Sequence, residues 1–291
     1  MVAPSQKRRA VEQVKATGTC SQRRACRLLG LRRSSCRYQP RALTPKRERE
    51  ETRIIALSQA HPRYGYRRVH TLLGREGLRP SLRRVQRIRR RERLRVMGPA
   101  RRPKRQASAD AKVSAQSRND VWCFDFVFDS TAHGSTLKML TILDEYTRYC
   151  IAIVVGHRLN SASVVEALSD AILEHGTPQH VRCDNGSEFI AARLQTWLRQ
   201  AQIRSRFIEP GSPWQNGHNE SFNGKMRDEC LEREVFANLL EARSVTAVWR
   251  EEYNTFRPHR SRGQLTPAQC QLSGRPPGSL RSDIAQSPQP H

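Results

Sequence analysis

Three acidic side chains in the second half of the sequence are best placed to do chemistry: Asp125, Asp184 and Glu220. Asp125 stands in the apolar run CFDFV, where a charge is costly unless it is paired or bound to a metal. Asp184 follows the short segment HVRC, and ligands collect beyond the carboxyl ends of strands in open α/β sheets. Such a carboxylate set suits Mg²⁺ or Mn²⁺. Two ions about 3.5–4 Å apart support in-line displacement at phosphorus, so we predict phosphodiester chemistry.

The residues after Glu220 predict a helix with two distinct faces. A step of 100° per residue places Asn223 and Arg227 on the same face as Glu220. The opposite side is apolar and suited to packing on a sheet, with Phe222, Met226 and Cys230. We therefore expect Glu220 to point into a cleft, with Asn223 and Arg227 contacting DNA beside it. Lys225 of the same helix is a further expected DNA contact.

Each of the three carboxylates also has an ordinary explanation when taken alone. Asp125 could lie on the solvent-exposed face of a strand, and Asp184 could belong to an ordinary Asp-Asn-Gly turn. Glu220 could lie at a helix N-terminus, where the helix dipole favours a negative charge. Asp129, Asp144 and Glu188 compete as metal ligands. The joint placement favours the first set, with Asp125 at the sheet centre best able to bridge both ions.

The pattern of apolar residues from Trp122 onward predicts the elements that position these side chains. Three closely spaced strands suggest an antiparallel meander, and strands and helices then alternate. The expected elements are strands at 121–128, 137–143 and 148–155, a helix at 161–176, a strand at 180–184, a helix at 192–202, a strand at 203–209 and a helix from 219. This is the order of a ribonuclease-H-like α/β core with a mixed five-stranded sheet (an analogy at the level of fold).

Positive charge is concentrated in the first part of the chain. Residues 1–118 contain 34 Lys and Arg against 7 Asp and Glu, whereas the remainder contains 18 against 20, giving the whole chain a net charge of +25. A solvated surface does not need such an excess, and nucleic acid is the usual polyanionic partner. We therefore expect the N-terminal part to bind DNA.

The basic part reads as all-α. Ser21 can cap a helix that Gly30 ends, and Ser81 can cap a second Arg-rich helix after a Gly-containing turn. The stretch 46–96 therefore resembles a helix-turn-helix whose second helix enters a DNA groove. The arginines expected to contact DNA are Arg67, Arg68, Arg83, Arg84, Arg87 and Arg90.

These signals divide the chain into five parts. We expect a basic helical segment at 1–45, a helix-turn-helix-like domain at 46–96, a basic linker at 97–119, a catalytic core with a C-terminal arm at 120–275, and a flexible tail at 276–291. The eight cysteines form no CxxC pair and are expected to be free buried thiols. No apolar run suits a membrane span or secretion signal, so we expect a soluble cytoplasmic protein.

Several motifs resemble those of the OrfB transposases of the insertion-sequence-three (IS-three) family, which have a retroviral-integrase-like core. They are HPRYGYRRVHTLLGREGLRPS at 61–81, WCFDFVFD at 122–129, LDEYTRY at 143–149, RCDNGSEF at 182–189, PWQNGHNESFNGKMRDEC at 213–230 and YNTFRPHRSRGQLTPAQ at 253–269. The 35 residues between Asp184 and Glu220 match the family's spacing. Asn219 and Arg262 depart from it, since the family usually has apolar residues there.

The resemblance implies a reaction, its catalytic residues and its partners. It places the acidic triad on Asp125, Asp184 and Glu220, and the basic residue of the helix on Arg227. Water would cut at the terminal inverted repeats of a mobile element, and the freed 3′ hydroxyl would attack target DNA. An upstream OrfA protein, or a fusion to it, is an expected partner, because the chain begins at its own Met1 and reads as the OrfB part. A homo-oligomer on DNA and a bacterial, nucleoid-associated location are also expected.

Two other functions remain open on the sequence. One is a DNA-binding regulator with an inert core, which the intact triad disfavours. The other is a nuclease of the same fold that cuts DNA but does not join it, and detecting a joined product would distinguish a transposase from such a nuclease.

Overall fold

The computed structural model describes residues 4–18, 20–38, 42, 44–96, 115–207 and 217–273. The chain divides into two compact units, residues 1–52 and 53–291, whose boundary falls inside the helix Pro45–Ala60. The domain bounds expected from the sequence stay a prediction. Most of the expected linker and the whole expected tail at 276–291 lie outside the described residues. None of the described helices is long and apolar enough to cross a bilayer.

The first unit consists of short helices around a small apolar cluster. Ser21 accepts a hydrogen bond from the backbone amide of Arg24 and so caps the second helix, as the sequence predicted. Gly30, just beyond that helix, has a positive φ of 57°. The helices are α1 (Pro4–Ala16), α2 (Gln22–Leu28) and α3 (Arg33–Cys36), followed by α4, which crosses into the second unit.

The second unit begins with a bundle of three helices, here called the helical module. It consists of α4 (Pro45–Ala60) from Arg53 onward, α5 (Tyr66–Arg75) and α6 (Leu82–Arg91). Its core contains Val69, Leu72 and Leu73 of α5 against Val85 and Ile88 of α6. The Ser81 hydroxyl accepts from the Arg84 amide and caps α6. The apolar spacing in the sequence therefore predicted both helices of the helix-turn-helix-like pair.

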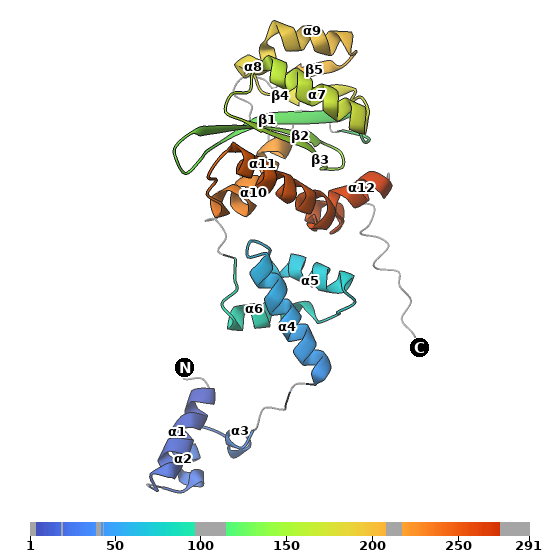
Figure 1. Ribbon diagram of the computed structural model, residues 1–291. Helices are drawn as coiled ribbons and strands as arrows, with labels where there is room; N and C mark the ends of the chain where they lie inside the picture. Colours follow the sequence, from blue (N-terminus) through green and yellow to red (C-terminus); the bar gives the residue numbers. More distant parts are fainter. Residues whose placement is uncertain are drawn as a thin grey trace, which may run out of the picture. The chain divides into compact units, whose positions relative to one another are not determined.

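A five-stranded sheet in the order β3-β2-β1-β4-β5 forms the centre of the unit (Figure 1). β1, β2 and β3 are antiparallel, whereas β4 runs parallel to β1 and β5 parallel to β4. The mixed sheet and the meander confirm the fold predicted from the sequence. The strands are β1 (Val121–Ser130), β2 (Thr136–Asp144), β3 (Cys150–Gly156), β4 (His180–Cys183) and β5 (Arg204–Phe207).

Helices cover both faces of this sheet because successive strand residues point to opposite sides. Trp122 and Phe124 of β1 face one core with α7 and α9, whereas Cys123 and Val127 face the other with α10 and α11. Gly176, with φ at +88°, ends α7 as expected. The remaining elements are α7 (Ser161–His175), α8 (Ser187–Ile190), α9 (Ala192–Gln200), α10 (Gly217–Glu229), a 3₁₀ turn (Leu231–Arg233), α11 (Leu239–Glu251), a π-helix (Glu252–Phe256), a 3₁₀ turn (Arg260–Arg262) and α12 (Pro267–Ser273).

The eight cysteines are all free, and six of them are buried. The six agree with the expectation of buried cysteines, whereas Cys20 and Cys36 are half-buried. Burial raises the pKa of the Cys123, Cys150 and Cys183 thiols well above the usual range, so they stay protonated and unreactive at neutral pH.

Candidate active site

Asp125 lies in the middle of β1, directly opposite Thr141 of β2. On the other side of β1, Cys123 is paired with Arg182 of the parallel strand β4. Two residues further along both strands, Asp125 comes to lie beside Asp184, which follows the last residue of β4. The register of the sheet therefore places the two aspartates side by side where β4 ends, although 58 residues lie between them in the sequence.

Both oxygens of Asp125 are held by hydrogen bonds. The backbone amide of Phe126 donates to Oδ1 at 2.8 Å, and Nδ2 of Asn223 donates to Oδ2 at 2.8 Å. Asn223 is itself buried, and its Oδ1 accepts from the Thr141 hydroxyl at 3.3 Å. The Asp125 carboxylate is therefore fixed in orientation by its own strand and by α10.

Asp184 is oriented by the turn that follows it. Its Oδ1 accepts a hydrogen bond from the backbone amide of Gly186 at 2.9 Å. A Cβ atom at Gly186 would lie 3.0 Å from that same oxygen, so a larger residue there would push the carboxylate aside by a few tenths of an ångström. The Asp-Asn-Gly sequence thus forms a turn and also aims a carboxylate.

Glu220 projects from the first turn of α10 and is exposed. Phe222, Met226 and Cys230 are buried against the sheet, as the helical pattern predicted. Burial raises the pKa of Asp125 to about 6, and the nearby charges of Asp184 and Glu220 add to the rise. The charges of Asp184 and Glu220 therefore lie near enough to Asp125 to disfavour its ionised form, and a bound cation would offset this repulsion.

The carboxylates are not drawn together into one ligand cluster. Within the described residues, no three His, Cys, Asp or Glu side chains are grouped closely enough to hold an ion. The donor types and the mutual repulsion at Asp125 nevertheless suit a divalent cation, whose charge would offset that repulsion. The residues that could hold it are Asp125, Asp184 and Glu220.

The competing acids have other partners. Asp144 is fully buried and accepts hydrogen bonds from Thr147 and from the Asn119 amide. Glu188 forms an ion pair with Lys138, whose ammonium lies 4.0 Å from the centre of the Phe126 ring. Asp129 accepts from the next backbone amide, that of Ser130. Asp144 and Glu188 therefore have side-chain partners of their own, whereas Asp129 is held, like Asp125, by the amide that follows it.

The basic residues expected at DNA fall into two groups. Arg67, Arg83, Arg87, Arg90 and Arg227 are exposed, and Arg84 is half-buried. Asn223, Lys225 and Arg68 have partners inside the protein: Asp125 for Asn223, Ser221 for Lys225 and Glu229 for Arg68. Burial lowers the pKa of Lys225 to about 8, and nearby Arg257 and Arg68 contribute. For both groups, contact with DNA stays a prediction.

Sequence reasoning missed a buried ion pair behind the two strand aspartates. Arg182, two residues before Asp184, donates to Glu145 Oε2 at 2.6 Å, and His218, two residues before Glu220, lies 3.3 Å from Glu145 Oε1. Glu145 belongs to the LDEYTRY motif at 143–149, and its side chain is 1% exposed. The available signal was a pair of acidic residues, Asp144 and Glu145, directly after the apolar run 137–143, since a buried acid needs a partner.

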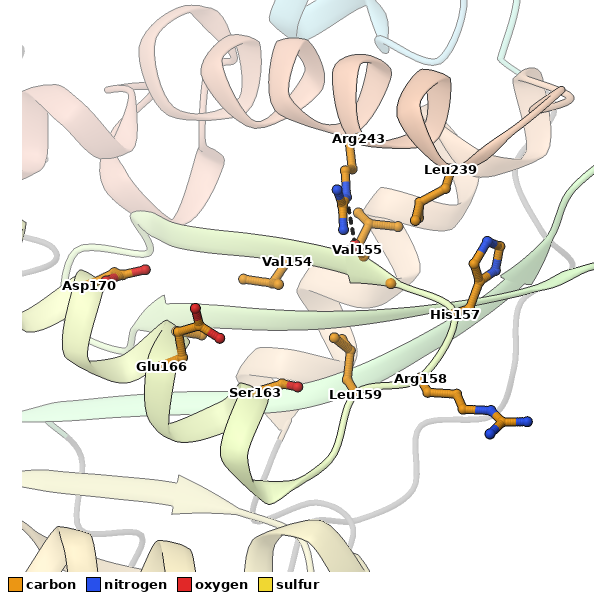
Figure 2. A pocket seen from close by; sticks show the side chains of 12 residues that line it. Val154, Val155, His157, Arg158, Leu159, Ser163, Glu166, Asp170, Leu239 and Arg243 are labelled. Atoms are coloured by element: carbon orange, nitrogen blue, oxygen red, sulfur yellow. Dashed lines mark hydrogen bonds between the residues drawn. The ribbon is translucent and has the colours of Figure 1, made fainter.

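A cavity of about 570 Å³ lies elsewhere in the fold, between β3, α7 and α11 (Figure 2). Its lining includes His157, Arg158, Glu166, Asp170 and Arg243, but none of the three carboxylates. The Arg243 guanidinium donates to the Val155 carbonyl at 2.9 Å, joining α11 to β3. This cavity is therefore separate from the candidate active site.

Comparison with known proteins gives matches over nearly the whole described chain. Two models described as integrase core domain match residues 115–213 and 201–267, and an HTH-like domain matches residues 45–104. The insertion element IS476 39.2 kDa protein of Xanthomonas euvesicatoria is 42% identical over 92% of this chain and 77% of its own length. The insertion element IS407 31.7 kDa protein of Burkholderia multivorans is 39% identical over 86% and 90%. The chain belongs to the insertion-element transposases with an integrase core domain.

The fold agrees with this assignment. A chain of the simian T-cell lymphotropic virus intasome, solved in complex with PP2A regulatory subunit B56 gamma, superposes with a TM-score of 0.50 at 18% identity, covering 82% of this transposase and 77% of that chain. The protein is thus a DNA transposase of the DDE polynucleotidyl transferase type, with a ribonuclease-H-like core and a helix-turn-helix-like DNA-binding region.

Proposed function

We propose that Asp125, Asp184 and Glu220 form the catalytic centre of this transposase and hold two divalent ions, Mg²⁺ or Mn²⁺. The observation that carries the proposal is the placement of the carboxylates: the register of β1 and β4 sets Asp125 next to Asp184, and Asn223 of the helix that carries Glu220 binds Asp125. The raised pKa of Asp125 agrees with this placement. When bound, the ions would supply an activated hydroxyl and a stabilised leaving oxygen at phosphorus.

The chain's own groups orient the reaction. Asn223 and the Phe126 amide hold Asp125, the Gly186 amide holds Asp184, and α10 presents Glu220 at the same edge. Arg227, exposed two helical turns after Glu220, is positioned to bind a phosphate of the strand being cut. We propose that this centre cuts at the terminal inverted repeats and that the freed 3′ hydroxyl then attacks target DNA.

The proposal extends to partners. The exposed arginines of α6, Arg83, Arg87 and Arg90, would bind the element ends. An OrfA protein, separate or fused, would contribute further DNA recognition, and a homo-oligomer would hold the two ends together. Size measurements on the protein with end DNA, with and without OrfA, test these assemblies.

Substitution of Asp184 by Asn tests the catalytic proposal. The variant keeps the size of the side chain and an oxygen for the Gly186 amide, but it removes a metal-binding charge. With Mg²⁺ and labelled element ends, we expect wild type to cut and join, and Asp184→Asn to lose at least roughly 100-fold in rate.

Glu188→Gln is the matched control, since Glu188 follows closely in sequence and pairs with Lys138. It should retain most of the activity. A cut product without a joined product would indicate a nuclease, and full activity of Asp184→Asn would refute the assignment of the site.

A further inference from the structure

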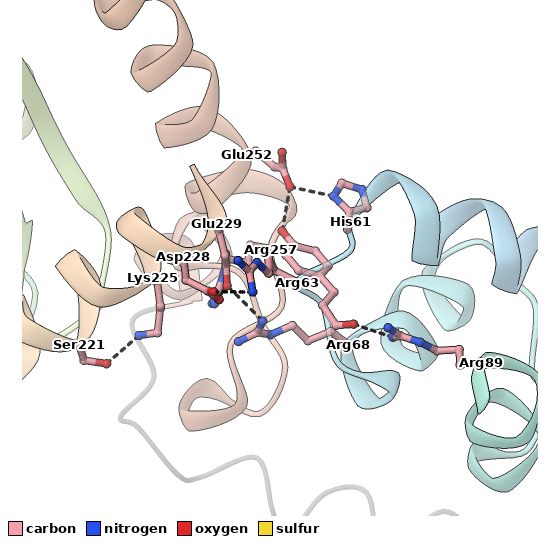
Figure 3. Close-up of polar contacts among 11 residues, drawn as sticks. His61, Arg63, Arg68, Arg89, Ser221, Lys225, Asp228, Glu229, Glu252 and Arg257 are labelled. Atoms are coloured by element: carbon pink, nitrogen blue, oxygen red, sulfur yellow. Dashed lines mark hydrogen bonds and ion pairs between the residues drawn. The ribbon is translucent and has the colours of Figure 1, made fainter. Parts of the chain in front are cut away.

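Glu229, the last residue of α10, is a buried carboxylate that receives two guanidinium groups (Figure 3). Arg257 binds both of its oxygens, with Nε 2.6 Å from Oε2 and Nη2 2.5 Å from Oε1. Arg68 of α5 donates to Oε1 at 3.3 Å. Because Arg68 belongs to the helical module and Glu229 to the helix of Glu220, this carboxylate joins the two.

Further polar contacts surround this point. Arg63 lies 3.1 Å from Asp228. The Tyr64 hydroxyl donates to Glu252 at 2.8 Å, and His61 Nδ1 lies 3.1 Å from the same oxygen. The four contact residues of the segment 61–68 therefore all bind acids of α10 or of the π-helix. We call this set of contacts, including the pairing at Glu229, the junction.

The junction has an apolar part as well. Phe256, at the end of the π-helix, packs against the apolar core of the helical module. The His61 ring stacks on Tyr64 with centroids 4.7 Å apart and lies 5.1 Å from the Phe256 ring. Arg75 of α5 donates to the Phe256 carbonyl at 2.7 Å. Packing and hydrogen bonding together make this a built interface rather than a surface ion pair.

The junction contacts the Arg-rich helix α6 on one side and the helix of Glu220, α10, on the other. On the module side, Arg89 of the Arg-rich helix α6 donates to the Tyr64 carbonyl at 2.6 Å. On the core side, α10 carries Glu220 nine residues before Glu229, which is about 13.5 Å along a helix. Asn223 on the same helix holds Asp125. A shift of α10 at Glu229 therefore reaches two of the three carboxylates.

We propose that the junction couples DNA binding by α6 to the placement of Glu220 and Asp125, with Arg68 and Glu229 as positioning residues. The inference rests on the proposed function for the role of those carboxylates. The helical module and α10 move as one body, so DNA held on the module stabilises the arrangement of the catalytic helix.

Hydrogen exchange followed by mass spectrometry tests the coupling without any catalysis. The full chain is mixed with duplex DNA of mixed sequence at low salt in EDTA, where the uncompensated carboxylates disfavour direct contact between phosphate and the site. In wild type, we expect DNA to slow amide exchange in α5 and α6, and also in α10 by roughly 5-fold or more. In Arg68→Gln, which leaves the Arg257–Glu229 pair intact, slowing should be confined to α5 and α6. Loss of slowing in all three helices would make Arg68 a DNA contact and would overturn its role as a positioning residue.

Two further variants make the test specific. Arg53→Gln breaks an ion pair with Glu76 inside the helical module and should behave as wild type. Arg63→Glu should lose the response of α10, and Arg63→Glu combined with Asp228→Arg should regain it. Retained slowing of α10 in Arg68→Gln, or equal loss in Arg53→Gln, would overturn the proposal. These readouts do not depend on cleavage, so they stand apart from the outcome of the Asp184→Asn test.

Discussion

Asn223 shows how a residue beside the carboxylates can control them. It donates to one oxygen of Asp125 while the Phe126 amide binds the other, and it also accepts from Thr141. Residues that orient metal ligands typically contribute 10–100-fold to metal affinity or activity. We therefore expect Asn223→Ala to raise the Mg²⁺ concentration needed for half-maximal cleavage by roughly 10-fold or more, as measured in a metal titration.

The control for Asn223 is Ser221→Ala, an exposed change on the same helix. It should leave the metal requirement unchanged. Circular dichroism should show both variants folded, since neither removes a large apolar group. A normal metal titration for Asn223→Ala would show that the Phe126 amide alone suffices to orient Asp125.

The helix α6 carries adjacent arginines with opposite roles. Arg89 is buried and donates to the carbonyls of Tyr64 and Leu94, whereas Arg90 is exposed. Arg89→Leu should lower the free energy of unfolding by roughly 1–3 kcal/mol for each carbonyl left unpaired. Arg90→Leu removes the same charge but should change stability by less than about 0.5 kcal/mol. Urea unfolding monitored by circular dichroism compares the two, and equal losses would contradict the assigned roles.

Elements with a strong local pattern were predictable from the sequence. The run VWCFDFVF formed β1, and Ser81 capped α6, because hydrophobic period and capping act over a few residues. The sequence did not predict the separate helices of the C-terminal arm. In its π-helix at Glu252–Phe256, the Tyr253 ring packs against Phe222, which lies 31 residues earlier in the sequence.

The sequence predicted the three acids of the candidate site but not the residues that hold them in place. Helical stepping placed Asn223 and Glu220 on one face, yet it could not show that the Asn223 amide reaches Asp125, 98 residues away. The pairing of Glu229 with Arg257 and Arg68 was likewise invisible, since nothing local in the sequence indicates a partner 28 or 161 residues distant. Contacts of this kind arise from the folded arrangement of whole elements.

The positive charge that attracts DNA and the proposed catalytic carboxylates lie in different parts of the chain. The first 118 residues hold nearly two-thirds of the basic side chains, while the remainder, which contains all three carboxylates, is nearly neutral. DNA affinity should therefore fall steeply with salt, with each neutralised phosphate adding roughly −0.9 to the log–log slope. Replacing Arg83, Arg87 and Arg90 by Ala should make the slope shallower by up to about 2.7, the value for three such phosphates.

Three exposed arginines of the catalytic core, Arg193, Arg199 and Arg204, provide a control of equal charge. Their replacement by Ala removes the same net charge, so a purely long-range attraction would weaken binding equally in both triple variants. Direct phosphate contacts on α6 instead predict that the slope changes mainly in the α6 variant. Titrations of duplex DNA at several salt concentrations measure both slopes, and equal slopes would show that net charge, rather than the face of α6, attracts the DNA.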